Sequence, residues 1–402
     1  MKSRHLYIIS LLLFFSCSKD IDIPFPKDRI PTDIITPTRK GRTTNKDVVE
    51  PKGRTILVYL AGDNNLSHEV KEMHEALREG WNPTTMGSLV IFADSKVGKP
   101  LLIKFEKGRD EIISDTLRRY ANENSASPEL LHQVILDTKE VAPGESYGMV
   151  LFSHATGWLP EKAFLNPTRW GASADDGPKI TPRSIFDDRG REMELADFAS
   201  AIPDGMFDFM AFDMCFMSSV ETAYALRNKT QYLLAAAPEI LSPGFTPIYK
   251  TSLDMLYKTE ANLEGFGQAF YDHFNGLQGA HQSAAISVVN TSEMDALASL
   301  TREIDAQLNQ QQIDQVQYYD RNGKPHVFFD YGDYMSHAAN PQQQENLEEL
   351  LSKIVIFKRN TPKLININIT THSGLSVYIP QGALPRLNDA YEETDWWKAV
   401  GY

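Results

Sequence analysis

Short, almost continuously apolar segments alternate with amphipathic segments along this chain, and this alternation restricts the folds open to it. Four apolar segments, rich in β-branched and aromatic residues, are 55–62, 88–94, 147–154 and 207–215. Segments with apolar residues at helical spacing are 66–77, 127–143 and 193–204. Strands that are apolar on both faces are typical of parallel sheets covered by helices on both sides. We therefore expect an α/β fold, with a mostly parallel sheet flanked by two layers of helices.

Further segments of both kinds occur later in the chain. Three more strands are expected at residues 232–240, 284–290 and 374–380. Helices are expected at 262–274 and 293–308, and a hairpin at 101–108 with 111–119. No linker rich in Pro, Gly or Ser divides this region, so we expect residues 54–402 to form one domain, with a helical and strand portion toward its C-terminus.

The N-terminus has the layout of a secretory signal peptide. Lys2 and Arg4 precede an apolar run over residues 6–15, which is too short to cross a membrane, since a spanning helix needs roughly 20 apolar residues. We therefore predict a signal peptide over residues 1–16.

Cys17 follows the apolar run directly and resembles the cysteine of a lipobox, at which bacterial lipoproteins are cleaved and lipidated. Residues 17–53, rich in Pro, Thr and charged residues, would then be a flexible tether. We expect an exported protein, lipid-anchored to the bacterial outer membrane or the cell surface. Ordinary cleavage, leaving Cys17 unmodified, is the alternative.

The net charge of −13 argues against nucleic acid as a partner, because binding to phosphates relies on clustered Lys and Arg. We expect a monomer without a cofactor. The acidic pairs Asp175-Asp176 and Asp187-Asp188 lie in a loop-like stretch and leave calcium as the alternative, although no defined metal-binding motif is present.

The strongest candidates for chemistry are the last residues of two predicted strands, His154 and Cys215. A thiol becomes an effective nucleophile when an imidazole accepts its proton. If the two strands are adjacent and parallel, both side chains emerge at the same edge of the sheet. The alternatives are a packed core thiol and a structural histidine.

Three sequence blocks resemble the clostripain family of cysteine peptidases, relatives of caspases, gingipains and legumain. The blocks are YLAGDNNL at residues 59–66, LFSHATGW at 151–158 and FDMCFMSSVE at 212–221. The late segment 374–380 and the aromatic-rich end at 395–397 are similar too.

The resemblance implies a caspase-like three-layer sandwich and a catalytic dyad, with Cys215 as nucleophile and His154 as base. The oxyanion hole is expected from backbone N–H groups of Ala155 and Cys215. The family usually has glycine at position 155 and alanine at position 214, where this chain has Ala155 and Met214. A glycine there would allow a positive φ that alanine adopts only at a cost.

Substrate specificity is expected to come from acidic residues. The resemblance places Asp213 in the wall of the primary specificity pocket, and on an extended strand it faces the same side as Cys215. Asp63 and Asn64 are further candidates for substrate binding. We therefore expect an endopeptidase that cleaves proteins or peptides after Arg, then Lys, through a thioester acyl-enzyme. The alternative role for Asp213 is a structural carboxylate.

Other residues and the same dyad suggest three alternative functions. A serine hydrolase using Ser153 or Ser218 lacks the G-x-S-x-G signature. A caspase-like surface protein that only binds peptides or glycoconjugates and a thiol acyltransferase or transpeptidase both stay open. The long segment 159–192 contains several basic residues, and in the family self-cleavage at such a residue can open the active site, although a plain surface loop explains the segment equally well.

Overall fold

The computed structural model of the chain describes residues 53–121, 124–159, 185–321 and 323–401. The predicted signal peptide, Cys17 and almost all of the tether lie outside the described residues. So do Asp175, Asp176 and residues 160–184 of the long basic segment.

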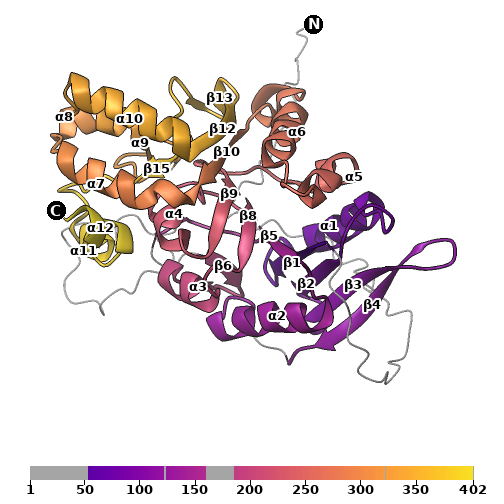
Figure 1. The fold of residues 1–402 in the computed structure, drawn as a ribbon. Coiled ribbons are helices and arrows are strands. Elements are labelled where there is room, and N and C mark those ends of the chain that lie inside the picture. The colour runs from indigo at the N-terminus through magenta and orange to yellow at the C-terminus, as the bar shows by residue number, and fades with distance from the viewer. Residues whose placement is uncertain (1–52, 122–123, 160–184, 322, 402) are drawn as a thin grey trace, which may run out of the picture.

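A large sheet forms the centre of the described molecule (Figure 1), with strand order β12-β10-β9-β8-β5-β1-β2-β3-β4. Its five central strands are parallel: β9 (Thr230–Ala235), β8 (Phe207–Asp213), β5 (Ser146–Phe152), β1 (Arg54–Gly62) and β2 (Leu89–Ser95). Antiparallel strands extend both edges: β10 (Ala285–Asn290), β12 (Val355–Asn360), β3 (Leu101–Lys107) and β4 (Ile112–Arg119). The mostly parallel sheet and the hairpin at 101–119 are thus as predicted.

Helices cover both faces of this sheet. One face carries α1 (Ser67–Gly80), α5 (Tyr249–Ser252) and α6 (Leu263–Asn275). The other carries α2 (Pro128–Val141), α3 (Leu195–Ala201), α4 (Val220–Leu226), α7 (Met294–Ile304), α10 (Pro341–Ile354) and α12 (Asp395–Val400). Strand β1 shows why two layers are needed, because its alternate side chains enter two separate cores: Ile56 and Val58 pack with α1, and Leu57 and Tyr59 with α2.

The remaining elements are short. They are β6 (Ile185–Asp188), β7 (Arg191–Met193), β11 (Phe329–Asp330), β13 (Lys363–Leu364), β14 (Ile367–Asn368), β15 (Ser376–Val377), α8 (Gln310–Ile313), α9 (Tyr331–Ser336) and α11 (Pro385–Glu392). Single 3₁₀ turns occur at Thr246–Ile248, Leu253–Tyr257, Gly279–His281 and Thr291–Glu293.

Three sequence predictions need correction. The strand predicted at 374–380 is only two residues long and pairs with β11 outside the main sheet. The helix predicted at 293–308 ends at Ile304, because Asp305 adopts a left-handed conformation (φ 48°) that ends the helix. The end of the predicted loop 159–192 forms β6 and the start of β7, so Asp187 and Asp188 lie in a strand.

The helix boundaries follow ordinary capping. The Ser127 side chain accepts a hydrogen bond from the Leu130 N–H at the start of α2, and Pro128 occupies the first turn, where its missing N–H is not needed. Asn340 and Gln343 form a capping box at the start of α10. In the described part of the chain, no helix combines the length and apolar character that crossing a membrane requires.

Candidate active site

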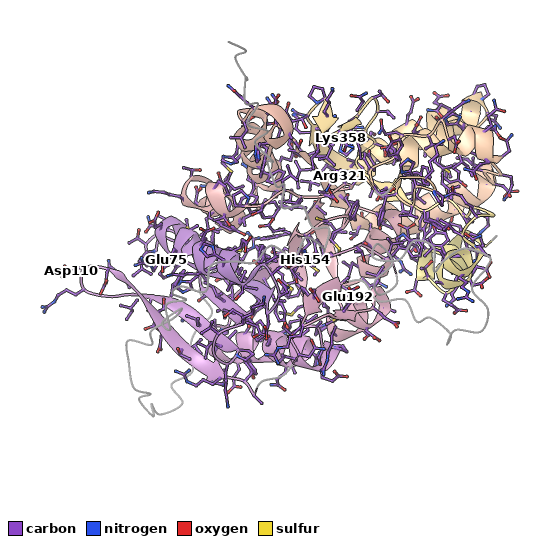
Figure 2. All side chains as sticks on the ribbon, turned by 180° about the vertical axis from the view of Figure 1, so that it is seen from behind. Glu75, Asp110, His154, Glu192, Arg321 and Lys358 are labelled. Atoms are coloured by element: carbon purple, nitrogen blue, oxygen red, sulfur yellow. The ribbon has the colours of Figure 1, made fainter. Side chains whose placement is uncertain are left out.

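His154 and Cys215 follow two neighbouring parallel strands at matched positions. Strands β5 and β8 pair in register up to Phe152 and Asp213, and His154 and Cys215 each lie two residues beyond that last pair. Both strands therefore end two residues earlier than predicted, but the expected arrangement holds: His154 and Cys215 emerge at the same edge of the sheet. In Figure 2 His154 lies near the centre of the view, whereas Asp110, between β3 and β4, lies at its periphery. His154 is buried.

Asn65 is the hydrogen-bond partner of His154. It lies in the loop between β1 and α1, and its Oδ1 atom is 2.5 Å from the Nε2 atom of His154. A carbonyl oxygen only accepts, so Nε2 must carry a proton as the donor. In the neutral imidazole the Nδ1 atom is then left as the acceptor. Sequence reasoning missed Asn65; the signal available was its position just after a strand that neighbours β5.

Cys215 lies at a sharp turn that opens directly after β8. Its Sγ atom is buried and accepts a hydrogen bond from the Ile240 N–H at 3.3 Å. The next residue, Phe216, has φ 60°, and its N–H donates to the Pro238 carbonyl at 2.9 Å. A positive φ is strained for a bulky residue and is more common at functional sites than elsewhere.

The loop after His154 packs against this turn. Ala155 has no positive φ and forms an isolated bridge with Ile185 of β6. The left-handed residue in the loop is Gly157 (φ 63°), where an added Cβ would lie 2.8 Å from the Phe216 carbonyl oxygen. The conformational freedom of glycine is therefore needed at position 157, and Ala155 carries no penalty of that kind.

A cavity of about 350 Å³ opens beside His154. Its lining residues come from four segments and are Asn65, Leu66, His68, Glu69, residues 152–154, Asp213, Met214 and residues 240–244. Two acids, Asp213 and Glu69, thus share one cavity with the histidine. Glu69 was not foreseen; burial raises the pKa of its carboxyl, and its Oε2 atom has no hydrogen-bond partner among the described residues.

Asp213 is held by the loop that follows β9. It is 4% exposed, and its Oδ2 atom accepts a hydrogen bond from the Phe245 N–H at 2.8 Å. Burial raises the pKa of the Asp213 carboxyl to about 7, against the opposing effect of that hydrogen bond. Gly244 (φ 60°) packs so closely that an added Cβ would lie 2.0 Å from Asp213 Oδ1.

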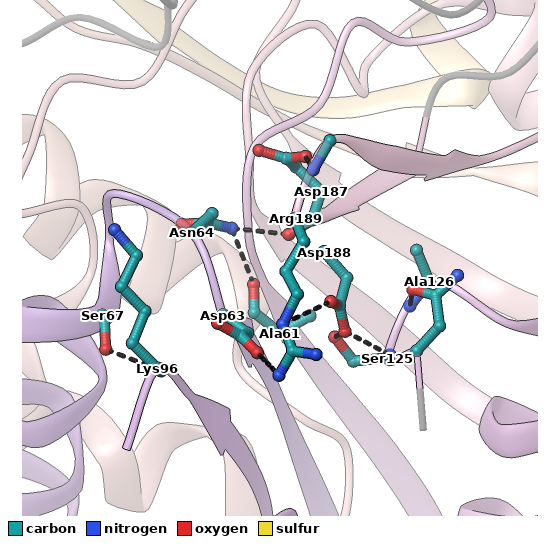
Figure 3. Close-up of polar contacts among 12 residues, drawn as sticks. Ala61, Asp63, Asn64, Ser67, Lys96, Ser125, Ala126, Asp187, Asp188 and Arg189 are labelled. Carbon is teal, nitrogen blue, oxygen red and sulfur yellow. Dashed lines mark hydrogen bonds and ion pairs between the residues drawn. The ribbon is translucent and has the colours of Figure 1, made fainter. Parts of the chain in front are cut away.

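Asp63 and Asn64 lie apart from the cavity lining. Figure 3 shows Asp63 in an ion pair with Arg189 and Asn64 directed toward two backbone carbonyls. The Asn64 Nδ2 group donates to Ala61 at 3.3 Å and to Asp187 at 2.6 Å. The structure therefore engages both side chains in joining the β1 loop to β6, and of the three consecutive residues 63–65 only Asn65 faces the cavity.

Two serines next to the site are engaged with backbone. The Ser153 hydroxyl donates to the Ala61 carbonyl and accepts from the Asp187 N–H, and the Ser218 hydroxyl donates to the Gly374 carbonyl. These contacts tie loops together and give no sign of a serine nucleophile.

Comparison with known proteins decides the family. A family model described as the clostripain family matches residues 58–379. The chain belongs to the clostripain family. The matched region contains the second half of β1, the turns that carry His154 and Cys215, and the strand β15.

Solved structures of similar chains agree with this clostripain-family assignment. An inactive zymogen C11 protease from Parabacteroides distasonis is 32% identical, with a TM-score of 0.75, and the match covers 88% of this chain and 99% of that one. A secreted C11 cysteine protease from Bacteroides thetaiotaomicron, in complex with an irreversible peptide inhibitor, is 26% identical, with a TM-score of 0.71 and coverage of 87% and 99%.

A further secreted C11 cysteine protease from the same organism, iotapain, is 23% identical, with a TM-score of 0.75 and coverage of 87% and 100%. That likeness shows the fold alone. No curated protein matches the chain. The predicted caspase-like α/β fold and the predicted enzyme class are confirmed: this clostripain-family chain is a cysteine peptidase.

Proposed function

We propose that this peptidase cleaves proteins or peptides after Arg, and less efficiently after Lys, with Cys215 as nucleophile and His154 as base. The observation that carries the proposal is the cavity that joins His154 to the two acids Asp213 and Glu69. An acidic cavity next to the catalytic groups favours a basic side chain immediately before the cleaved bond.

The chemistry follows from the tautomer of His154 set by Asn65. The Nδ1 atom accepts the Sγ proton of Cys215, and Sγ attacks the carbonyl carbon of the peptide bond. The tetrahedral intermediate collapses, the C–N bond breaks, and the imidazolium gives its proton to the leaving amine. Water, deprotonated by the same imidazole, then hydrolyses the thioester and releases the acid product and the thiol.

We place the oxyanion hole at the backbone N–H groups of Ala155 and Cys215. A backbone donor needs no particular side chain, so alanine at position 155 can supply it as glycine would. The absence of a positive φ at Ala155 supports this reading, because the substitution then costs no backbone strain. Met214 is buried and lines the cavity without a polar group near the chemistry.

Activation by self-cleavage belongs to the proposal. Cys215 is 0% exposed in the intact chain, so substrate cannot reach Sγ without a rearrangement. The segment 159–192 contains basic residues of the kind that the proposed specificity would accept. The similar chain from Parabacteroides distasonis is described as an inactive zymogen, which agrees with an intact chain that needs processing.

We further propose that residues 54–402 form one peptidase domain, exported and lipid-anchored through Cys17 to the bacterial outer membrane or the cell surface. The apolar run ending at Ser16 and the polar tether support this. The similar Bacteroides thetaiotaomicron protein is described as secreted.

The test is a panel of fluorogenic peptides that differ only in the residue before the cleaved bond: Arg, Lys, Asp or Leu. Cys215→Ala should lose hydrolysis by at least a thousandfold with an unchanged circular dichroism spectrum, and His154→Ala should lose nearly as much, because the two act as a unit. Turnover retained by Cys215→Ala would refute the dyad. An added amine distinguishes hydrolysis from acyl transfer, since a transpeptidase would form the amide product.

A further inference from the structure

We propose that Arg321 is a positioning residue for the nucleophile and acts on Cys215 through Glu239. The Nε atom of Arg321 donates a hydrogen bond to Glu239 Oε2 at 2.7 Å. The two residues are 82 positions apart in the chain, and their side chains are only 21% and 7% exposed. The inference rests on the proposed role of Cys215 and deepens it, because it names a residue from a distant segment that controls the thiol.

Glu239 lies between two backbone groups that hold the Cys215 turn. On one side of it, the Pro238 carbonyl accepts a hydrogen bond from the Phe216 N–H at 2.9 Å. On the other side, the Ile240 N–H donates to Cys215 Sγ at 3.3 Å. Phe216 has φ 60°, a conformation that persists only when surrounding contacts impose it. A shift of Glu239 would therefore disturb both contacts that fix the nucleophile.

Arg321 belongs to a segment that packs on the same turn. The buried Asp320 carboxylate accepts a hydrogen bond from the Phe328 N–H at 3.3 Å, which ties Phe328 to the residue next to Arg321. The Phe328 ring stacks on that of Phe216, with ring centroids 4.3 Å apart and an angle of 10° between the planes. The segment thus contacts the turn after Cys215 through Phe328 and the loop that holds this turn through Arg321.

The charge balance of this pair matters as much as its geometry. Glu239 is almost fully buried, and a buried carboxylate without a partner is costly because it has lost its hydration. It also directly precedes Ile240, whose N–H contacts the thiol. An unbalanced negative charge there would disfavour the thiolate, which is the nucleophilic form. Arg321 supplies the opposing charge and a charge-assisted hydrogen bond, roughly twice as strong as a neutral one.

Removing Arg321 should therefore slow the chemical step rather than weaken substrate binding. In Arg321→Gln we expect kcat to fall roughly tenfold with KM nearly constant, because less of the thiol is ionised and correctly placed. A contact that served stability alone would lower the thermal midpoint and leave the ionisation of the thiol in the folded protein unchanged. Ionisation of Cys215 is thus the measurement that separates the two roles.

The experiment records thiolate formation on the full chain with Cys17→Ser, in which Cys215 is the only cysteine. Thiolate absorbance at about 240 nm is followed from pH 5 to 10, and the spectrum of the same protein with Cys215→Ala is subtracted to remove the ionisation of tyrosines. The measurement needs neither substrate nor access to the buried thiol. The other titratable groups near the turn, Asp213 and His154, are the same in every variant compared.

Three variants give distinct expectations. Arg321→Gln should move the rise of thiolate absorbance to higher pH by about one unit, because Glu239 is then unbalanced. Glu239→Gln, whose amide oxygen still accepts from Arg321, should move the rise to lower pH. Combining the two substitutions should cancel most of both shifts, since the residues act as a pair. As a matched control, Lys324→Gln removes an exposed cation three residues from Arg321, paired with Asp314, and should change nothing.

The opposite signs of the two single shifts are decisive, because loss of a purely structural contact would not produce them. An unshifted rise in Arg321→Gln would overturn the proposal, and so would a double variant that keeps the full shift of Arg321→Gln. If Arg321→Gln does not fold, an unshifted rise in Glu239→Gln would overturn it equally. Turnover retained by Cys215→Ala would refute the proposed function instead, and that outcome is separate because the absorbance is measured without substrate.

Discussion

Asn65 Oδ1 lies 2.5 Å from His154 Nε2, and this contact sets the tautomer of the proposed base. It ties the loop after β1 to the loop after β5, two parallel strands that are neighbours in the sheet. Asn65 itself is exposed, so the contact orients the imidazole rather than filling the core.

Removing this amide should slow catalysis with little effect on substrate binding. Asn65→Ala should lower kcat about ten- to a hundredfold with KM nearly constant, because the imidazole loses its fixed tautomer and orientation. Asn65→Asp should restore orientation and move the acidic limb of the rate profile to higher pH, since a carboxylate favours the protonated ring. Asn82→Ala, which removes another exposed loop amide, serves as control; an unchanged kcat in Asn65→Ala would show that the contact is incidental.

The two acids of the cavity should determine specificity. Asp213→Asn should reduce kcat/KM for cleavage after Arg about a hundredfold, because the buried carboxylate supplies the matched partner for a guanidinium. Glu69→Gln should reduce it less, since Glu69 is more exposed. After processing, alkylation of Cys215 by iodoacetamide, which does not use the pocket, should proceed at a similar rate in all three proteins. If Asp213→Asn kept full selectivity for Arg, a different acid would have to bind the substrate arginine. Asp63 is a poor candidate for that role, because it is already paired with Arg189.

The raised pKa of Asp213 should appear in the pH dependence of binding and of stability. Burial raises this pKa from 3.8 to about 7, so the inhibitor benzamidine, whose cation needs the carboxylate, should bind more tightly as the pH rises through 7. The folded chain holds a proton that the unfolded chain loses between pH 4 and 7, so stability should fall over that window, by an amount on the order of a few kcal/mol. Asp213→Asn should lose both dependences. A benzamidine inhibition constant that stays flat from pH 5.5 to 8 in the wild type would contradict the assignment.

Lipid anchoring depends on one residue outside the described structure. The full-length protein should take up labelled fatty acid and partition into detergent, and Cys17→Ser should lose both, because two acyl chains are sufficient for stable anchoring. Ser16→Ala retains the cysteine and is the matched control. If Cys17→Ser stays membrane-bound, the apolar run acts as an uncleaved anchor.

The sequence predicted those parts of the fold and site that depend on strand periodicity and chain order. Residues 147–154 and 207–215 are mostly apolar, which is typical of buried parallel strands, and parallel neighbours place His154 and Cys215 at one edge. The predicted strand at 374–380 was wrong because its apolar residues belong mostly to a loop packed in the core, with only Ser376–Val377 paired. Apolar content indicates that a segment is buried, and this segment is buried without forming the hydrogen-bonded pairing of a long strand.

Contacts between loops could not be predicted from the hydrophobic periodicity of the sequence. Asp63, Asn64 and Asn65 are adjacent polar residues with similar side chains, yet they face an ion pair, two backbone carbonyls and the imidazole respectively. Which one enters the site depends on the turn after β1 and on the approach of β6, whose residues are more than a hundred positions away. The same holds for Glu69 of α1, which lines the cavity together with the distant loop 240–244.

The packing of the loops after His154 and Cys215 against each other can be tested with a matched pair of glycines. Gly157 and Gly205 have nearly the same left-handed φ, 63° and 61°, but an added Cβ meets the Phe216 carbonyl at 2.8 Å in the first and nothing within 4 Å in the second. Gly205→Ala should therefore cost only the conformational penalty, about 1 to 2 kcal/mol. Gly157→Ala carries that same penalty and a clash with the turn after Cys215, so it should unfold at lower denaturant concentration than Gly205→Ala. Because the displaced loop begins at His154, it should also lower kcat/KM for a peptide ending in Arg at least tenfold, whereas Gly205→Ala should retain wild-type kcat/KM. Equal stability and equal activity in the two variants would show that the loops after His154 and Cys215 are not held together as the geometry indicates.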